Sequence, residues 1–556
     1  MTDALRRQLL GAPGWWRADP WLVVAFIGLA TFLAVFVLYP VVLVTTTPSV
    51  DDWVRVLSTP RWRAATLNTL TMVVLSTASS LLLGFLYAFA VTKSRVPGHR
   101  VFDVVPLLLL VTPPFVGGLA FILLLGRRGL ITSTLLGLDV SIYGWHGLWL
   151  AQTLSFFPVA FVILRSTLQA IDPTLEQAAR DLGASRVQVL RTITLPLATP
   201  GLLAAALFIA IAVLSDFGNP MLIGGRFRVL ATEVYTQLTG WAAVGTSAAL
   251  GLLLLLPAAL FFALQQHVQR RTRQRFATVG GRAGSLPSPP PVQLLRWILF
   301  AGCVLVTGFV ASTYLVIGLG ALTQVWGVDS GLTFDHLRGV QRHLPELGNS
   351  LRFALLAAAL CTVLSLASAY LVHRGGVPLR GAIDLSTLLP AAVPGTLMGV
   401  AFVLAFNAPP FRLTGTGAII VLVMAVSYLP VGYRICAAAL AQLQPSLDDT
   451  ARNLGASRMR TFLDVTLPLL RSAGTAAFVF CFIQGVGTLS AVIFLVSFDT
   501  PLASVSILNL AEQGHWGRAA ALSSALVGVT FVSLAAVHGL IGRGLIGRGF
   551  TSFVER

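Results

Sequence analysis

The chain has 556 residues, of which 56% are hydrophobic and only 11% are charged. A water-soluble protein cannot bury so much apolar surface, so the composition excludes a soluble globular protein and indicates a polytopic membrane protein. The formal net charge of +17 would suit nucleic acid, but the arginines gather in short loops beside apolar runs, which indicates a lipid bilayer and no nucleic-acid partner.

In chain order, the apolar runs predict about twelve membrane-spanning helices, since one span takes about 20 apolar residues. Six spans are expected near residues 21–44, 66–92, 102–126, 143–168, 200–224 and 244–268. Six more are expected near residues 293–322, 347–373, 382–406, 416–440, 473–497 and 518–542. The sequence therefore predicts an all-α fold of two six-helix repeats, which are parallel because six is an even number.

Polar segments divide the chain into a tail over 1–20, a first half over 21–268, a linker over 269–292, a second half over 293–542 and a tail over 543–556. Arginines occur before the first span and after the second, sixth and twelfth spans, which all lie on one side of the membrane. Such loops face the cytoplasm, so we expect both termini to be cytoplasmic. Some arginines lie on the other side and weaken this pattern, among them Arg61, Arg63, Arg226 and Arg228.

One polar segment of the first half recurs in the second half. LEQAARDLGASRVQVLRTITLPL at Leu175–Leu197 returns 272 positions later as LDDTARNLGASRMRTFLDVTLPL at Leu447–Leu469. Upstream the halves align again at an offset of 281, with Asn68 on Asn349. The change of offset predicts nine extra residues in the first half, within 127–147.

Each copy of this segment predicts two short helices that meet at a glycine. Thr174 and Gln177 have the spacing of a capping box, and Gly183 supplies the left-handed residue that ends the first helix. A second helix follows over 184–194, and Pro196 marks the start of the next span. The second copy repeats this arrangement with Ser446, Asp449, Gly455, residues 456–466 and Pro468.

The spacing of both copies resembles the EAA loop of ABC importer permeases, which reads E-A-A, three residues, G, nine residues and I-x-L-P. In that family the loop forms a coupling helix that lies in a cleft of an ATPase subunit. The resemblance assigns this role to Glu176, Gln177, Ala178, Ala179, Arg180, Gly183, Leu195 and Pro196, and to Asp448, Asp449, Ala451, Arg452, Gly455, Leu467 and Pro468.

The two copies differ at the acid of the motif, which is Gln177 in the first and Asp449 in the second. A salt bridge from that position to an ATPase cannot form in the first copy, unless the neighbouring Glu176 replaces the acid. We therefore expect two ATPase contacts of similar shape and different charge.

No enzyme active site is visible in the sequence. The pattern G-x-x-x-x-G-K-[ST] of a P-loop is absent, so ATP hydrolysis is expected in a separate subunit. The resemblance implies two copies of an ABC ATPase, an extracytoplasmic substrate-binding protein and a bacterial inner membrane. We expect this chain to bind neither metal nor cofactor, while its partners use ATP. The binding protein would dock near residues 45–65, 225–243, 323–346 and 498–517.

The fused layout of two halves is similar to ferric-iron importer permeases, and thiamine and aminoethylphosphonate importers share it. Ser215–Gly225, Leu489–Leu495 and Leu502–Leu508 resemble the iron type. A twelve-span secondary carrier is an alternative of another class, but such carriers place their basic motif between spans two and three. A membrane scaffold that transports nothing is a third alternative, and it would explain the repeated loops but not the candidate path residues.

Four residues are candidates for the translocation path. Asp216 lies in the fifth predicted span, where an ionised group is costly unless it faces a cavity or a partner. It could equally cap the helix that follows. Pro113 and Pro114 in the first half, and Pro394 in the second, interrupt the third span of their halves. These breaks either shape a gate or simply kink the packing.

Overall fold

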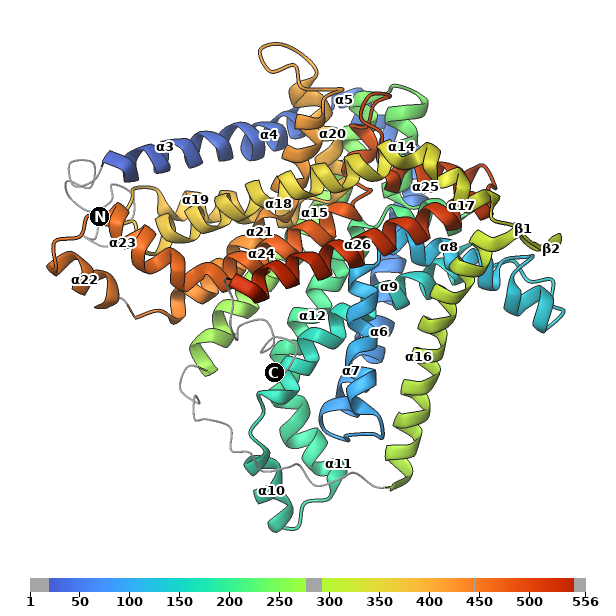
Figure 1. Ribbon diagram of the computed structural model, residues 1–556, viewed down its shortest axis with the longest axis horizontal. Helices are drawn as coiled ribbons and strands as arrows, with labels where there is room; N and C mark the ends of the chain where they lie inside the picture. The colour runs from blue at the N-terminus through green and yellow to red at the C-terminus, as the bar shows by residue number, and fades with distance from the viewer. Residues whose placement is uncertain (1–19, 277–292, 445, 545–556) are drawn as a thin grey trace.

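The computed structural model describes residues 20–276, 293–444 and 446–544, and these residues are almost entirely helical (Figure 1). Eleven of the described helices are long and apolar enough to cross a membrane, and a twelfth is counted if the bent pair Arg380–Ala392 and Gly395–Phe406 is one span. The prediction of an all-α polytopic protein with about twelve spans is confirmed. The predicted tails and most of the predicted linker lie outside the described residues.

The first half begins with α3 (Pro20–Leu33), a π-helical turn (Ala34–Leu38) and α4 (Tyr39–Thr46), which form one continuous span. Its further helices are α5 (Val50–Ser58), α6 (Pro60–Thr92), α7 (His99–Val111), α8 (Pro114–Leu125), α9 (Trp145–Gln169), α10 (Pro173–Asp181), α11 (Arg186–Val189), α12 (Leu195–Ser215), α13 (Gly218–Ile223), α14 (Leu230–Tyr235) and α15 (Val244–Phe276). Three more π-helical segments cover Leu130–Leu135, Leu190–Thr194 and Thr236–Gly240.

The second half begins with α16 (Gln293–Leu322) and a short antiparallel pair, β1 (Thr323–Val325) and β2 (Asp329–Leu332). Its further helices are α17 (Asp335–Gly339), α18 (Leu344–His373), α19 (Arg380–Leu388), α20 (Gly395–Phe406), α21 (Gly417–Gln442), α22 (Ser446–Asn453), α23 (Arg458–Thr461), α24 (Leu467–Val486), α25 (Ala503–Glu512) and α26 (Trp516–Gly544). Between them lie 3₁₀ turns at Val340–His343, Leu389–Ala392 and Val492–Phe494, and a π-helical segment at Phe462–Thr466.

Each half is built on three helices that pack against one another: α6, α9 and α12 in the first half, and α18, α21 and α24 in the second. Small residues allow the close approach. A Cβ on Gly84 of α6 would collide with Ala160 of α9, and a Cβ on Gly432 of α21 would lie 2.5 Å from the Ser365 hydroxyl of α18. Such small-residue contacts are the usual means by which membrane helices pack, because lipid offers no hydrophobic drive between them.

The first span of each half packs on the opposite half. α3 contacts α18 and α19, and α4 contacts α20, all of which belong to the second half. In return, α16 contacts α6, α7 and α8 of the first half. The two halves are therefore held together by an exchange of their first helices.

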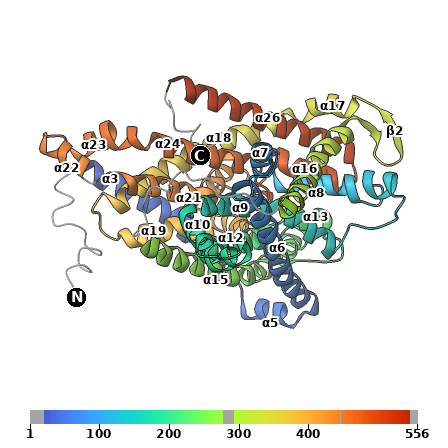
Figure 2. The same cartoon turned by 90° about the horizontal axis from the view of Figure 1, so that it is seen from below.

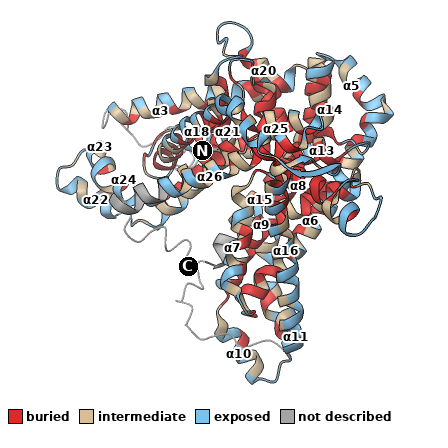
Figure 3. Cartoon of the chain, turned by 45° about the vertical axis from the view of Figure 1, so that its right-hand side comes forward, coloured by how far each residue is buried: buried red, intermediate tan, exposed pale blue. Residues whose placement is uncertain are grey.

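The two halves meet at one end and diverge at the other. In Figure 1 the helices of the first half run mostly vertically and those of the second half mostly horizontally, and they converge at the upper right. The repeated segments occupy the two free ends, with α10 at the bottom and α22 at the left, and Figure 2 again shows them apart. Buried residues concentrate where the halves meet, whereas α10, α22 and α23 are largely exposed (Figure 3).

Several predicted spans have different bounds in the structure. The span expected at 102–126 is divided at Thr112 and Pro113 into α7 and α8, and that at 382–406 bends by 114° after Ala392. The spans expected to end at 224 and 497 end at Ser215 and Val486, since short helices and turns follow. The nine-residue insertion is confirmed, because residues 126–144 join α8 to α9 whereas only 407–416 join α20 to α21.

Candidate coupling loops and central cavity

The first repeated loop begins at α10 and turns at Gly183. The carboxylate of Asp172 accepts a hydrogen bond of 2.9 Å from the Thr174 amide and so caps the helix. At the other end, Ala184 N–H donates to Ala179 C=O at 3.0 Å and Gly183 N–H donates to Arg180 C=O at 2.8 Å. This is a Schellman ending, in which Gly183 takes a φ of +87° that glycine adopts without steric cost.

The second loop repeats this turn. Ala456 N–H donates to Ala451 C=O at 3.0 Å, Gly455 N–H donates to Arg452 C=O at 2.9 Å, and Gly455 has a φ of +88°. The predicted glycine-ended helices are therefore present in both halves. No atom lies within 4 Å of a Cβ placed on Gly183 or Gly455, so the backbone conformation is what requires glycine there.

One prediction about these loops is wrong. The helix is capped by Asp172 instead of Thr174, because Pro173 occupies the first helical position and the carboxylate before it reaches the free amides. Pro196 stands at the start of α12 as predicted, and the helix before it joins that span without a break. The helix that starts at Arg186 continues through a π-helical segment into α12, since the wider turn accommodates the missing amide of Pro196.

Glu176 of the first loop is buried and paired within the chain. Its Oε1 lies 3.0 Å from Nζ of Lys93, which follows α6, and the two side chains are 6% and 9% exposed. The same oxygen accepts a 3.0 Å hydrogen bond from the Thr194 hydroxyl at the start of α12. The carboxylate therefore ties α10 to the ends of two spans and is turned away from solvent.

The second loop contains the matching contact. Arg374, which follows α18, donates to Asp448 Oδ2 at 2.7 Å, and the Thr466 hydroxyl donates to Asp448 Oδ1 at 3.4 Å. Arg374 also donates to Leu443 C=O at 2.6 Å. Lys93 and Arg374 were not among the predicted loop residues, although they align at the same offset as Asn68 and Asn349.

The exposed residues of the first loop differ in charge from those at equivalent positions of the second loop, but the two loops have similar shapes. Gln177 and Asp449 are both exposed at the motif's acid position. The leucines before the two glycines, Leu182 and Leu454, are 89% and 84% exposed. Of the other predicted loop residues, Ala178, Pro196, Arg452 and Pro468 are exposed, whereas Ala179, Arg180, Leu195, Ala451 and Leu467 are half-buried.

A cavity of about 360 Å³ lies between the two halves. The first half contributes the break between α7 and α8, parts of α9, and the end of α12 with Asp216. The second half contributes part of α16, Tyr428 of α21, and the segment Gln484–Ser490 at the end of α24. Its walls carry hydroxyl and amide groups among apolar side chains, from Thr112, Ser155, Thr313, Gln484, Thr488 and Ser490.

Asp216 lies at the end of α12 and is 8% exposed. Its Oδ2 accepts hydrogen bonds of 3.0 Å from both Gln152 Nε2 and Asn219 Nδ2. Its Oδ1 accepts a bond of 3.3 Å from the Asn219 amide, so the residue caps the next helix and lines the cavity at once. Thr488, the residue aligned with it in the second half, lines the same cavity.

The proline breaks contact the segment after α24. Pro113 and Pro114 line the cavity, and a Cβ on Gly487 would lie 2.9 Å from Pro113 Cγ. Pro394 is not among the residues that line the cavity, but a Cβ on the next residue, Gly395, would collide with the Ser490 hydroxyl. Both breaks therefore close on Gly487–Ser490 from opposite halves.

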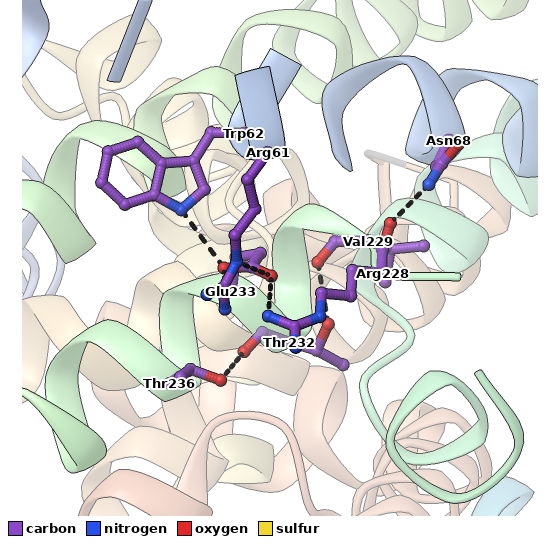
Figure 4. A network of polar contacts seen from close by, with 8 residues as sticks. All are labelled: Arg61, Trp62, Asn68, Arg228, Val229, Thr232, Glu233 and Thr236. Carbon is purple, nitrogen blue, oxygen red and sulfur yellow. Dashed lines mark hydrogen bonds and ion pairs between the residues drawn. The ribbon is translucent and has the colours of Figure 1, made fainter. Parts of the chain in front are cut away.

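A buried carboxylate that the sequence analysis missed organises the opposite end of the first half. Figure 4 shows Arg61 and Arg228 converging on Glu233 of α14, which is 1% exposed. Arg61 Nη2 lies 2.9 Å from the carboxylate, Arg228 Nη1 lies 3.4 Å from it, and Trp62 Nε1 donates to it at 3.2 Å. Asn68 Nδ2 donates to Arg228 C=O at 2.9 Å.

Asn68 and the aligned Asn349 make equivalent hydrogen bonds in the two halves. Like Asn68 Nδ2, Asn349 Nδ2 donates to a backbone carbonyl, that of Pro501, at 3.1 Å. The neighbouring hydroxyls also match. Thr69 accepts from the Leu230 amide and Ser350 accepts from the Ala503 amide, both at 2.9 Å. In each half the start of the second span thus fixes the short helix that precedes the last span.

Comparison with known proteins places the chain in a family. A family model described as "binding-protein-dependent transport system inner membrane component" matches residues 80–274 and again residues 361–545. The ferric transport system permease protein FbpB of Actinobacillus pleuropneumoniae is 36% identical over 476 residues, which cover 82% of this chain and 68% of that protein. Putative ferric transport system permease protein FbpB 1 of Haemophilus influenzae is 35% identical over 432 residues, with 74% and 67% coverage.

A shorter relative matches only part of the chain. The molybdenum transport system permease protein ModB of Escherichia coli is 31% identical over 227 residues, which are 98% of that protein and 40% of this chain. A protein less than half as long thus corresponds to part of a chain that matches the family model twice.

Proposed function

The chain belongs to the family of binding-protein-dependent transport system inner membrane components, and from this premise we propose how its two loops and central cavity carry out import. It is the multi-pass permease of an ABC importer in which one chain supplies both permease halves. In our proposal, one ATPase subunit docks on α10 and a second copy docks on α22. ATP is hydrolysed by these partners, and the permease itself binds no cofactor.

The observation that carries the proposal is the exposure of two equivalent leucines at two equivalent turns. Leu182 and Leu454 are held outward by glycines with nearly the same φ, at the free ends of the two halves. An exposed leucine gains free energy when a partner buries it, so a matched pair suits two identical partner clefts.

The buried ion pairs supply a mechanical connection from these docking sites to the spans. When the ATPases close on ATP, α10 and α22 would approach each other. Lys93–Glu176 and Arg374–Asp448 would carry this motion to α6 and α18, and the hydroxyls of Thr194 and Thr466 would carry it to the spans that follow. The halves would then turn as rigid bodies about the end at which they meet.

This mechanism implies an orientation of the chain in the membrane. The side with α10 and α22 would be cytoplasmic, with both termini on that side, as the arginine distribution also favours. The opposite side carries α5, α14, α17, α25 and the strand pair, and an extracytoplasmic binding protein would dock there. The cavity between the halves would be the translocation path.

We propose ferric iron as the cargo, since the two long relatives at 35–36% identity are named ferric transport permeases. The alternatives are thiamine and aminoethylphosphonate. The test is to reconstitute the permease with its ATPase and candidate binding proteins in proteoliposomes, and to measure which loaded binding protein stimulates ATP hydrolysis and radiolabelled uptake. Stimulation by a loaded thiamine- or phosphonate-binding protein, with none by a ferric-binding protein, would exclude iron. Uptake that follows an ion gradient without ATP would indicate a secondary carrier.

A further inference from the structure

We propose that Asp216 is a single, transient binding site for a cationic cargo in the cavity between the two halves. This inference rests on the proposed function, because it gives the central cavity a cargo and a contact residue. It also argues against an anionic cargo.

The charge balance of the cavity is the first argument. Among the described residues that line it, Asp216 carries the only carboxylate, and none is a lysine, arginine or histidine. The contacts recorded for the carboxylate come from neutral groups, namely the amides of Gln152 and Asn219. A buried carboxylate without a cation is costly to ionise, so a passing cation supplies the missing charge.

The end of α12 adds negative potential at Asp216, opposite the N-terminus of α13 that the residue caps. The residue follows the last turn of α12, whose free carbonyl groups form the negative end of a helix dipole. Gln152 is held in place by a 2.9 Å bond from the Ser76 hydroxyl to its Oε1. The Oδ1 atom of Asn219 is buried without a hydrogen-bond partner among the described residues. The hydrogen-bond donors at the carboxylate are therefore all neutral, and an unsatisfied acceptor lies on the neighbouring Asn219, which suits a cation better than an anion.

The asymmetry between the halves is the second argument. At the position of Asp216 the second half has Thr488, so the cavity offers one carboxylate where a symmetric cavity would offer two. A hard cation binds tightly only when several oxygen ligands surround it. One carboxylate with neutral hydroxyl groups nearby attracts the ion without trapping it, as transport requires.

The experiment uses the complete reconstituted importer and reads two quantities, iron uptake and ATP hydrolysis stimulated by the iron-loaded binding protein. D216N keeps the size and one acceptor of the side chain but removes the charge. We expect uptake per ATP to fall about tenfold or more, while stimulated hydrolysis stays within about twofold of wild type.

Three further variants separate a charge effect from a folding defect. D216N/T488D moves the carboxylate to the opposite wall, and we expect it to recover most of the lost uptake. D139N is the matched control, which removes a carboxylate from the exposed segment between α8 and α9, outside the cavity, and should transport normally. In T488D alone, two carboxylates should retain the cation and slow uptake.

Wild-type uptake by D216N would overturn the proposal. It would also be overturned if uptake and stimulated hydrolysis fell together in D216N without recovery in D216N/T488D, because Asp216 would then be structural. If the wild-type importer moves no iron with any loaded binding protein, the assignment of the cargo fails instead, and that result does not depend on Asp216.

Discussion

Lys93, the single lysine of the chain, lies 3.0 Å from Glu176, and both side chains are shielded from water. Glu176 is the residue that could have replaced the missing acid of the first loop. Its carboxylate is instead used inside the permease, so Gln177 remains neutral at the docking position. The proposed contacts with the two ATPases therefore differ in charge, since Asp449 is exposed at the equivalent position.

The first prediction concerns this ion pair. K93E or E176K leaves two like charges in a buried site, and loss of one partner of a buried pair costs about 3–5 kcal/mol. We expect either variant to hydrolyse ATP without matching uptake, because the loop is no longer fixed to the span. The double variant K93E/E176K should restore much of the coupling. The coupling is measured as uptake per ATP hydrolysed in proteoliposomes. Full coupling in both single variants would contradict the proposal that this ion pair transmits motion from the loop to the span.

The second prediction concerns the exposed leucines. L182A and L454A should leave the fold unchanged and weaken ATPase binding. Burial of a leucine contributes roughly 1.5–3 kcal/mol, or about ten- to a hundredfold in Kd. Titration of the ATPase against purified permease measures the change. L256A is the control, because Leu256 of α15 is 67% exposed and lies outside both loops. An unchanged Kd for both loop variants would argue against docking at these turns.

The third prediction concerns the glycines. G183V and G455V force a β-branched residue into a left-handed backbone, at a cost of about 1–3 kcal/mol each. We expect the double variant to lose the coupling between ATP hydrolysis and uptake. G183N/G455N is the control, because asparagine tolerates this backbone and the space around each site is open. Undiminished uptake by the valine variant would show that the turn is not required.

The fourth prediction concerns pH. The Thr174 amide donates to Asp172, which holds the pKa of that carboxyl below its usual value. The cap therefore stabilises α10 above the usual pKa of an aspartate and is lost as the pH falls through the lowered value. Hydrogen exchange at the first amides of α10 should accelerate in that acidic range. D172N should remove this pH dependence, since asparagine caps without titrating. The same acceleration in D172N would assign it to another group.

The elements that the sequence predicts well depend on short-range rules. The left-handed Gly183 and Gly455 follow from their position after a short polar helix, and the breaks near Pro113 and Pro394 follow from residues that cannot continue a helix. The error in the predicted capping residue shows where short-range rules stop being sufficient. Asp172 and Thr174 flank Pro173, and only the backbone geometry decides which side chain reaches the free amide.

The pairings between distant segments could not be predicted in the same way. Lys93 and Glu176 are 83 positions apart, and their contact depends on how the end of α6 packs against the loop. Glu233 and Arg61 are further apart still. The cavity requires α9, α12, α16, α21 and the segment after α24 to converge, which no local pattern contains. The alignment of the two halves gave one indirect indication of such contacts, because Asn68 and Asn349 occupy equivalent positions.

The exchange of first helices has a consequence for biosynthesis. α3 and α4 leave the ribosome about 300 residues before α18, α19 and α20, against which they pack. At roughly 5–20 residues per second, these helices wait on the order of 15–60 s in the bilayer without their partners. Lipid or an insertion chaperone must cover their packing face during this interval, and the first half can reach its final arrangement only after the second half has been synthesised.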